Sequence, residues 1–164
     1  MLNGSFGRFT RRPRRPAGGI AHLEPDKTCN ADVLAELRSG RKRTHWMWYI
    51  FPQIDGLGYS PTSKHYAIKS KEEAHQYLSH PILGRRLLEC AEMVLTIKGR
   101  SASEIFGSPD DLKLKSSMTL FASVTNPESV FTRVLDKYFH GQRDSKTLNL
   151  LEHLWTNEVL QELP

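Results

Sequence analysis

The clearest helical pattern in the chain is the stretch 81-PILGRRLLECAEMVLTIK-98. Its apolar residues recur every three or four positions, as one face of an α-helix requires. They are Leu83, Leu87, Ala91, Val94 and Leu95. Arg85 and Glu89 lie one turn apart on the other side of this helix, where they can pair. The stretches 127–139 and 145–160 have the same period, and we therefore expect an all-α fold.

Residues typical of helix starts and ends repeat along the chain. Three predicted starts place a capping residue before a proline at the first helical position: His80-Pro81, Ser108-Pro109 and Asn126-Pro127. Two further predicted starts are capping boxes, Ser70 with Glu73 and Ser101 with Glu104, and Asp144 can cap one more helix. Predicted ends are marked by Gly40, Gly99, Gly107 and Gly141. With a short helix over 31–39, these signals predict a compact domain of about seven helices and no clear strand.

Length and composition limit the class of protein. A chain of 164 residues is typical of a single domain. Cys29 and Cys90 have no CxxC spacing, so neither a disulfide framework nor a zinc ribbon is indicated. The chain contains no apolar run of about 20 residues that could span a membrane, and no secretory signal. We expect a cytoplasmic protein with no membrane partner.

The positive charge is concentrated at the N-terminus. The formal net charge is +5, from 23 basic and 18 acidic residues. Five arginines and no acidic residue lie in 1–23, so 18 basic and 18 acidic residues remain over 24–164. We expect residues 1–24 to be a disordered basic tail and 25–164 a single helical domain. The tail is either an arm that contacts nucleic-acid phosphates, a solvated extension or a misassigned start, and nucleic acid is not expected to bind beyond it.

The densest aromatic segment is 44-THWMWYIFPQ-53. Apolar side chains cover all of its faces, so its period does not assign 46–51, which fits a short irregular or extended piece as well as a helix. One interpretation makes this segment the centre of the core, because Trp and Phe bury the most area per residue. Another makes Trp46 and Trp48 a stacking wall for a planar ligand, with His45 and Gln53 at its rims.

A second polar segment is 109-PDDLKLKSSMTLF-121. On a helix, Lys113, Ser116 and Ser117 share one face, and hydroxyl-bearing residues are mediocre helix formers. These side chains are suited to binding an oxyanion such as phosphate or carboxylate. A stronger hypothesis makes Ser116 or Ser117 a nucleophile with Lys113 as its base. The alternative is that the hydroxyls bond to carbonyls one turn earlier in the helix.

Other motifs point to no cofactor or metal. The loop 53–60 contains two glycines but lacks the flanking elements of a dinucleotide fingerprint or a P-loop, so we expect a tight connection. The seven histidines form no HxxxH or HxH pair, so no metal site is predicted. The acidic pair at 110–111 lies in a first helical turn, where it complements the helix dipole.

Several short motifs appear together in order along the chain. They are Gly40-Arg41-Lys42, His45-Trp46-Met47-Trp48, Phe51-Pro52-Gln53, Gly56-Leu57-Gly58, Tyr66-Ala67-Ile68, Tyr77-Leu78, His80-Pro81, Ile105-Phe106-Gly107, Pro109-Asp110-Asp111, Ser116-Ser117-Met118-Thr119-Leu120-Phe121 and Asp136-Lys137-Tyr138-Phe139. Over about 31–151 the chain resembles an uncharacterised, mostly bacterial family, domain of unknown function 1810. This resemblance implies a compact, mainly helical domain and no established activity.

Two features of this family do not transfer to the chain. Some members carry a calpastatin label, but this sequence has no internal repeats or inhibitory linear segments of that kind. Members usually begin with a helix that contains a Phe and an Ala-Gln pair, and residues 1–30 do not resemble it.

The leading functional hypothesis is a polar pocket for a small anionic ligand, nucleotide-like if the Trp wall faces it. Its expected ligand-binding residues are His45, Trp46, Trp48, Gln53, Lys113, Ser116 and Ser117. If the pocket is catalytic, hydrolysis or glycosidic cleavage with His45 or Asp111 as the proton-transfer group is expected. The first alternative is a non-catalytic protein-interaction module with an exposed apolar patch. The second is nucleic-acid contact through the basic tail.

Overall fold

The described part of the chain is helical throughout. A computed structural model describes residues 30–161, and within them it has nine α-helices and no β-strand. The helices are α1 (Asn30–Arg38), α2 (Met47–Ile50), α3 (Pro61–Tyr66), α4 (Lys71–Ser79), α5 (Leu83–Thr96), α6 (Ala102–Phe106), α7 (Asp110–Ala122), α8 (Val130–Phe139) and α9 (Ser145–Gln161). The all-α prediction is confirmed. The predicted tail at 1–24 lies outside the described residues.

Within residues 30–161 the structure has two short helices, α2 and α3, beyond the seven that the sequence predicts. They contain four and six residues, too few for a helical period to show in the sequence. The segment 46–51 is accordingly neither extended nor irregular over most of its length, since Met47–Ile50 forms one helical turn.

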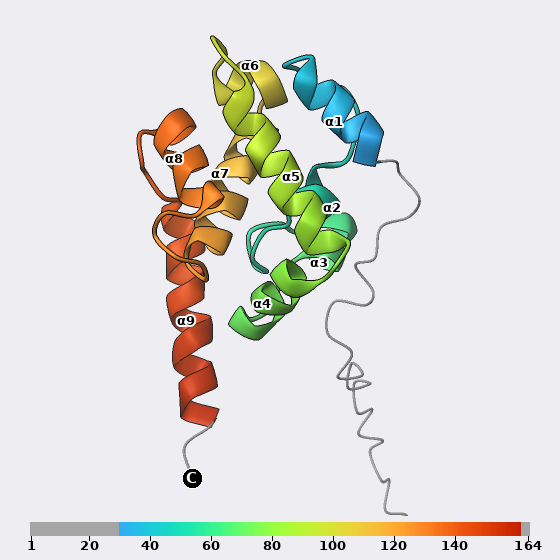
Figure 1. Cartoon of the computed structure of the whole chain (residues 1–164). Helices are drawn as coiled ribbons and strands as arrows, with labels where there is room; N and C mark the ends of the chain where they lie inside the picture. The colour runs from blue at the N-terminus through green and yellow to red at the C-terminus, as the bar shows by residue number, and fades with distance from the viewer. Residues whose placement is uncertain (1–29, 162–164) are drawn as a thin grey trace, which may run out of the picture.

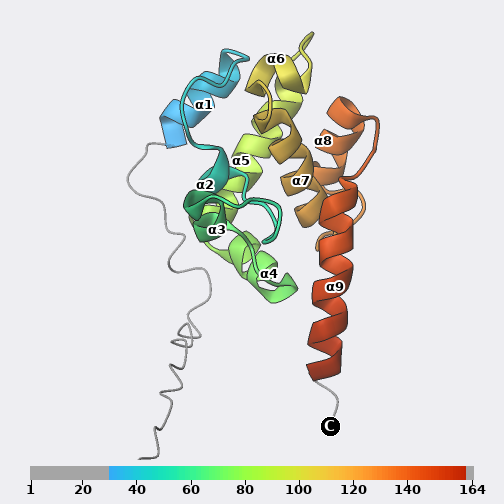
Figure 2. The same cartoon turned by 180° about the vertical axis from the view of Figure 1, so that it is seen from behind.

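Helix α5 is the central element of the fold. It packs on α8, α1, α4 and α2, while α7 packs on α8, α6 and α9 (Figure 1). Figure 2 shows α1 and α6 at one end of the molecule, α4 at the other, and α9 along one side. Among the described residues, no helix has the length and apolar character required to cross a membrane.

The predicted apolar face of α5 forms the middle of the core. Leu83, Leu87, Ala91 and Val94 are all buried, as the spacing predicts. A cluster of three rings lies beside this face: the ring centroids of Trp46, Phe51 and Phe106 are 6.2 Å apart in each pair. These tilted and edge-on arrangements are the favourable ones for aromatic pairs. Most of the aromatic segment therefore belongs to the core.

The capping predictions are partly confirmed. Ser101 and Glu104 form the predicted capping box of α6, and the side chain of Ser70 caps α4. The four predicted glycines, Gly40, Gly99, Gly107 and Gly141, all have positive φ, which glycine adopts without strain.

The three prolines that follow a capping residue are not at the first helical position, so this prediction is wrong. Pro109 is itself the N-cap of α7, and α8 begins after Ser129 rather than at Pro127. Helix α5 begins at Leu83, although the ring Nδ1 of His80 does accept the backbone N–H groups of Ile82 and Leu83. Each of these three prolines lies in a turn that precedes its helix, α5, α7 or α8.

Candidate functional site

A cavity of about 520 Å³ lies where four segments of the chain meet. These are the residues around α2, the loop before α3, the first half of α7 and the start of α9. The lining residues are Trp48, Gln53, Leu57, Gly58, Tyr59, Ser60, Ser63, Pro109, Leu112, Lys113, Ser116, Asp144, Ser145 and Lys146. A cavity of this volume lies within the range of small-molecule sites.

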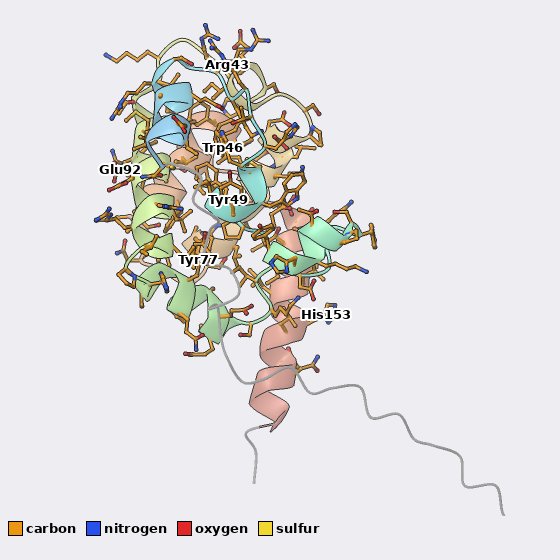
Figure 3. The ribbon with its side chains drawn as sticks, turned by 90° about the vertical axis from the view of Figure 1, so that its right-hand side faces the viewer. Arg43, Trp46, Tyr49, Tyr77, Glu92 and His153 are labelled. Carbon is orange, nitrogen blue, oxygen red and sulfur yellow. The ribbon has the colours of Figure 1, made fainter. Side chains whose placement is uncertain are left out.

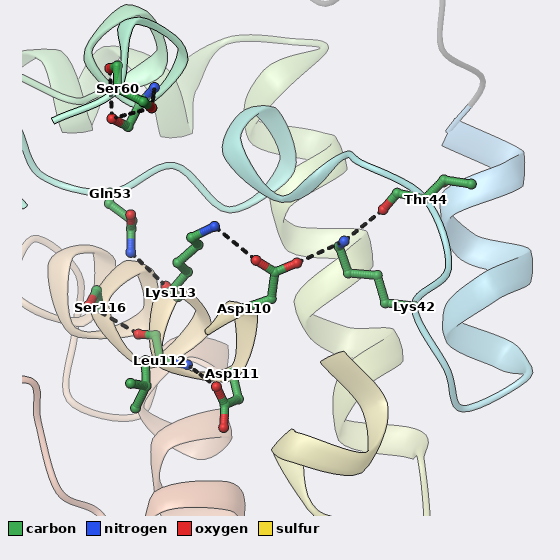
Figure 4. A network of polar contacts seen from close by, with 10 residues as sticks. Lys42, Thr44, Gln53, Ser60, Asp110, Asp111, Leu112, Lys113 and Ser116 are labelled. Atoms are coloured by element: carbon green, nitrogen blue, oxygen red, sulfur yellow. Dashed lines mark hydrogen bonds and ion pairs between the residues drawn. The ribbon is translucent and has the colours of Figure 1, made fainter. Parts of the chain in front are cut away.

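The charged centre of the site is a triad of Lys42, Asp110 and Lys113. The Asp110 carboxylate accepts from the Lys42 ammonium at 2.8 Å and from the Lys113 ammonium at 2.9 Å (Figure 4). The Lys113 ammonium also lies over the ring of Trp48, 4.4 Å from its centroid. Two cations share one anion, so the triad keeps a net positive charge.

Asp110 remains ionised in this arrangement. Its burial opposes the charged form, but hydrogen bonds from Lys42 and Lys113 and their positive charges outweigh burial and lower its pKa below the ordinary value. The Lys42 side chain is only 8% exposed, and it also donates to the carbonyl of Thr44 at 2.6 Å. Asp110 therefore fixes the position of Lys113 on the cavity wall.

Glu36 of α1 organises the loop before α2. Its carboxylate accepts from the backbone N–H groups of Arg43 and Thr44, from the Thr44 hydroxyl and from the indole N–H of Trp46. Partial burial would raise its pKa, but these hydrogen bonds lower it to about 2. Figure 3 shows Trp46 directed into the interior, below Arg43. The buried indole N–H has its partner in Glu36 and needs none from a ligand.

The hydroxyls of α7 largely follow the packing alternative. Ser116 donates to the carbonyl of Leu112 at 3.1 Å and Thr119 to that of Lys115 at 2.8 Å. Ser117 differs, because its hydroxyl is buried and has no hydrogen-bond partner. The carbonyl of Lys113, one turn before Ser117, accepts instead from the side-chain amide of Gln53 at 3.5 Å.

The loop 55–60 is held at the cavity from both of its ends. Backbone hydrogen bonds join Asp55 N to Ile68 O and Ile68 N to Gln53 O, both at 2.8 Å. At the other end, the Ser60 hydroxyl caps α3 by accepting from Ser63 N. Between them, the Tyr59 side chain is 86% exposed beside the cavity. The predicted tight connection thus forms one wall of the site.

Comparison with known proteins identifies the family. A family described as Protein of unknown function (DUF1810) matches residues 22–151. The chain belongs to this family. The family match begins at residue 22, nine residues before residue 31, where the motifs place the start of the resemblance. Residues 22–29 lie outside the described part of the chain.

One solved structure resembles this DUF1810 chain closely. It is the crystal structure of the conserved hypothetical protein Rv1873 from Mycobacterium tuberculosis, which is 54% identical in sequence with a TM-score of 0.73. The alignment covers 74% of this chain and 87% of that one. None of the curated proteins matches. The family and this neighbour give no activity, and neither supports the calpastatin label.

The DUF1810 site includes some of the expected ligand-binding residues and leaves others out. The cavity is lined by Trp48, Gln53, Lys113 and Ser116. Trp46 and Ser117 are buried in the core, and His45 is exposed outside the lining.

Asp111, the second candidate for proton transfer, is engaged elsewhere. It accepts from the Ser103 hydroxyl and from the Leu112 N–H, and it does not line the cavity. Within residues 30–161, no group of three His, Cys, Asp or Glu side chains could hold a metal ion.

Sequence reasoning missed two residues that shape the site, Glu36 and Lys42. Neither lies in a spacing pattern, because their partners are remote: Lys42 pairs with Asp110 and Glu36 with Trp46. It also missed Ser145 and Lys146, although the Asp144 cap before them was expected. Asp144 does cap α9, accepting from the N–H and hydroxyl of Thr147.

Proposed function

We propose that the cavity binds a small anionic ligand with a planar group, such as a nucleotide or nucleotide sugar. The observation that carries this proposal is the Lys113 ammonium, held over the Trp48 ring on the cavity wall. A cation and an aromatic ring side by side offer one ligand both an ionic partner and a stacking surface.

The charge of the site favours an anion. An ammonium has three N–H donors, and Asp110 takes one from Lys113 at 2.9 Å. Lys146 adds a second cation to the lining. Asp144 carries the one carboxylate of the lining. This carboxylate caps α9 by accepting from Thr147.

The exposed apolar residues support a planar ligand more than a protein-interaction patch. Tyr59 and Leu112 are 86% and 58% exposed, and both line the cavity. The other two large exposed apolar residues among those described, Ile82 and Leu88, are six positions apart. Ile82 precedes the first residue of α5 and Leu88 lies in its second turn, so the two do not share one face of this helix.

The proposal assigns binding and no reaction. His45 and Asp111, the expected proton-transfer groups, do not line the cavity. Lys113 and Ser116 do, but the Ser116 hydroxyl donates to the carbonyl of Leu112, and Lys113 pairs with the Asp110 carboxylate. A nucleophilic serine needs a base within hydrogen-bond reach, and the contacts of these two side chains are made with other groups.

Thermal unfolding in the presence of ADP-ribose, ADP and ribose 5-phosphate tests the proposal. A ligand at about 100 times its Kd should raise the Tm by about 5–10 °C. Lys113→Ala should reduce that increase by half or more, because a charged hydrogen bond contributes about 1.5–3 kcal/mol.

Lys115→Ala is the matched control, since Lys115 lies on another face of α7, 5.8 Å from the ring centroid of Phe139. It should keep the full increase. Trp48→Leu should weaken ADP and ADP-ribose more than ribose 5-phosphate, which has no base to stack. The proposal is wrong if no compound stabilises the natural chain more than the Lys113→Ala variant.

A further inference from the structure

A second cavity lies at the C-terminal ends of α1 and α5. Its volume is about 390 Å³, and it lies beside the C-terminal ends of the two helices, which Figures 1 and 2 place together near α6. Three cationic side chains line it, those of Arg38, Lys98 and Arg100, and its lining contains no acidic residue. It shares no lining residue with the first cavity.

The three cations have no carboxylate partner in the described part of the chain. The ion pairs found between residues 30 and 161 involve other lysines and arginines. Arg100 does lower the pKa of Glu104 through its charge, but more weakly than the hydrogen bonds from Ser101 do. The Glu104 carboxylate is used in the capping box of α6 rather than in a pair with Arg100.

Stabilisation of the free carbonyls at the C-terminal ends of α1 and α5 does not explain why these three cations lie there. Cations near a helix C-terminus usually stabilise its free carbonyls, but here other groups do so. The Lys137 ammonium donates to the carbonyls of Leu95 and Ile97 at 2.6 and 2.5 Å, and the Tyr138 hydroxyl donates to Val94 O at 2.6 Å. The end of α5 therefore already has a cation and a hydroxyl donor.

The end of α1 is satisfied by its own following residues. The Ser39 hydroxyl donates to the carbonyl of Glu36 at 2.6 Å, and Gly40 N donates to that of Leu37 at 2.9 Å. Gly40 also lets Arg100 approach, because a Cβ there would lie 3.2 Å from the Arg100 Cδ. The stem of Arg100 therefore lies against Gly40, and no ion pair of its guanidinium occurs between residues 30 and 161.

We propose that this second cavity binds a phosphate group. Arg38, Lys98 and Arg100 bring two guanidinium groups and an ammonium to the lining of one hollow, and arginine binds phosphate oxygens through two parallel hydrogen bonds. Arg41 and Arg43, both exposed, follow Gly40 within three positions of the sequence and add positive charge to this segment. The phosphate belongs either to a small phosphorylated molecule or to a nucleic-acid backbone, and the experiment distinguishes these sources.

The test compares two full-length double variants that lose the same charge. Arg38→Gln/Arg100→Gln removes both guanidinium groups of the cavity, and Arg85→Gln/Arg133→Gln removes two exposed arginines of α5 and α8. Calorimetry with pyrophosphate and fluorescence anisotropy with a single-stranded oligothymidylate measure the two sources of phosphate. The arginines among residues 1–23 are present in every variant, so the differences report on the cavity alone.

We expect the cavity variant to weaken binding of pyrophosphate about tenfold or more, while the control variant leaves it within about twofold. If only the oligonucleotide is affected, with a shallower dependence of affinity on salt, the phosphate belongs to a nucleic acid. Equal losses in the two variants, or no binding of either probe, would overturn the proposal. Unchanged unfolding midpoints show that both double variants are folded. Lys113→Ala, in the first cavity, should change the affinity neither for pyrophosphate nor for the oligothymidylate.

Discussion

At the scale of single residues, Glu36 decides which tryptophan belongs to the core. Four donors converge on its carboxylate, and one of them is the indole N–H of Trp46. Trp46 is 1% exposed, and a buried indole N–H without a partner would cost about 1–3 kcal/mol. Trp48, two positions later, lies partly exposed at the cavity. Glu36 thereby separates the structural tryptophan from the one proposed to bind a ligand.

Replacing Glu36 with Gln should destabilise the fold by about 2 kcal/mol at neutral pH. The pKa of Glu36 is lowered in the folded chain to about 2 from an ordinary value of 4.5. Its contribution is therefore fully present above pH 4.5 and is lost as the pH falls toward 2. Urea unfolding at several pH values measures this: the difference between the two chains should shrink between those values. A difference that stays constant down to pH 2 would contradict the assigned role.

The sequence could not assign the members of the aromatic segment individually. Trp46 and Trp48 lie in the same short aromatic segment. Trp46 belongs to the core, whereas Trp48 lines the cavity, and its role as a stacking surface for a ligand stays a prediction. The distinction depends on Glu36 and Lys113, which lie ten and more residues away. Ser116 and Thr119, by contrast, follow the rule for hydroxyls in helices and were predictable as one of two alternatives.

At the scale of secondary-structure elements, the contact between α4 and α5 depends on a glycine. A Cβ added at Gly84 would lie 2.0 Å from the carbonyl oxygen of Leu78 and 2.8 Å from that of Tyr77. These are backbone atoms, so no side-chain movement relieves the clash. The end of α4 can therefore pack against the first turn of α5 only where α5 has no side chain.

Gly84→Ala should lower the free energy of unfolding by about 3 kcal/mol and the Tm by about 10 °C. In a helix without this contact the same change would stabilise by about 1 kcal/mol, so the sign of the effect distinguishes the two cases. Arg85→Ala, at the next and exposed position of α5, should change the stability by less than about 0.5 kcal/mol. Differential scanning calorimetry measures all three chains.

The helices themselves were largely predictable, because each of the seven expected ones has either a full apolar period or a cap. Ser101, Glu104 and Asp144 perform the capping expected of them. The starts at Pro109 and Pro127 were misplaced, since a proline after a capping residue also suits a turn. The single-turn helix α2 has no signal that distinguishes it from an extended segment.

At the scale of the whole molecule, a balanced sum of charges conceals an uneven distribution. Residues 24–164 carry equal numbers of basic and acidic side chains, which suggested that no polyanion would bind the folded body. The structure nevertheless gathers Arg38, Lys98 and Arg100 around one cavity that lacks an acidic residue. Composition cannot reveal this, because α1 and the end of α5 meet only in the folded chain.

The two proposed sites make a joint prediction, since they lie on separate elements. The cavity at Lys113 should prefer ligands that combine an anion with a planar group, whereas the one at Arg38 should accept phosphate without a base. ADP-ribose should therefore lose most affinity through Lys113→Ala, and pyrophosphate through Arg38→Gln/Arg100→Gln. Sensitivity of both compounds to the same variant would show that the chain has one anion site rather than two.

An NMR titration of the ¹⁵N-labelled full-length chain with ADP-ribose tests most directly whether the cavity at Trp48 and Lys113 binds such a ligand. We predict that the indole N–H signal of Trp48 and the backbone amides of 57–60, 113 and 146 shift together. The indole signal of Trp46, bonded to Glu36, should stay in place. A Trp48 signal that does not move at saturating ligand, or shifts centred away from Lys113, would show that the ligand does not bind in this cavity.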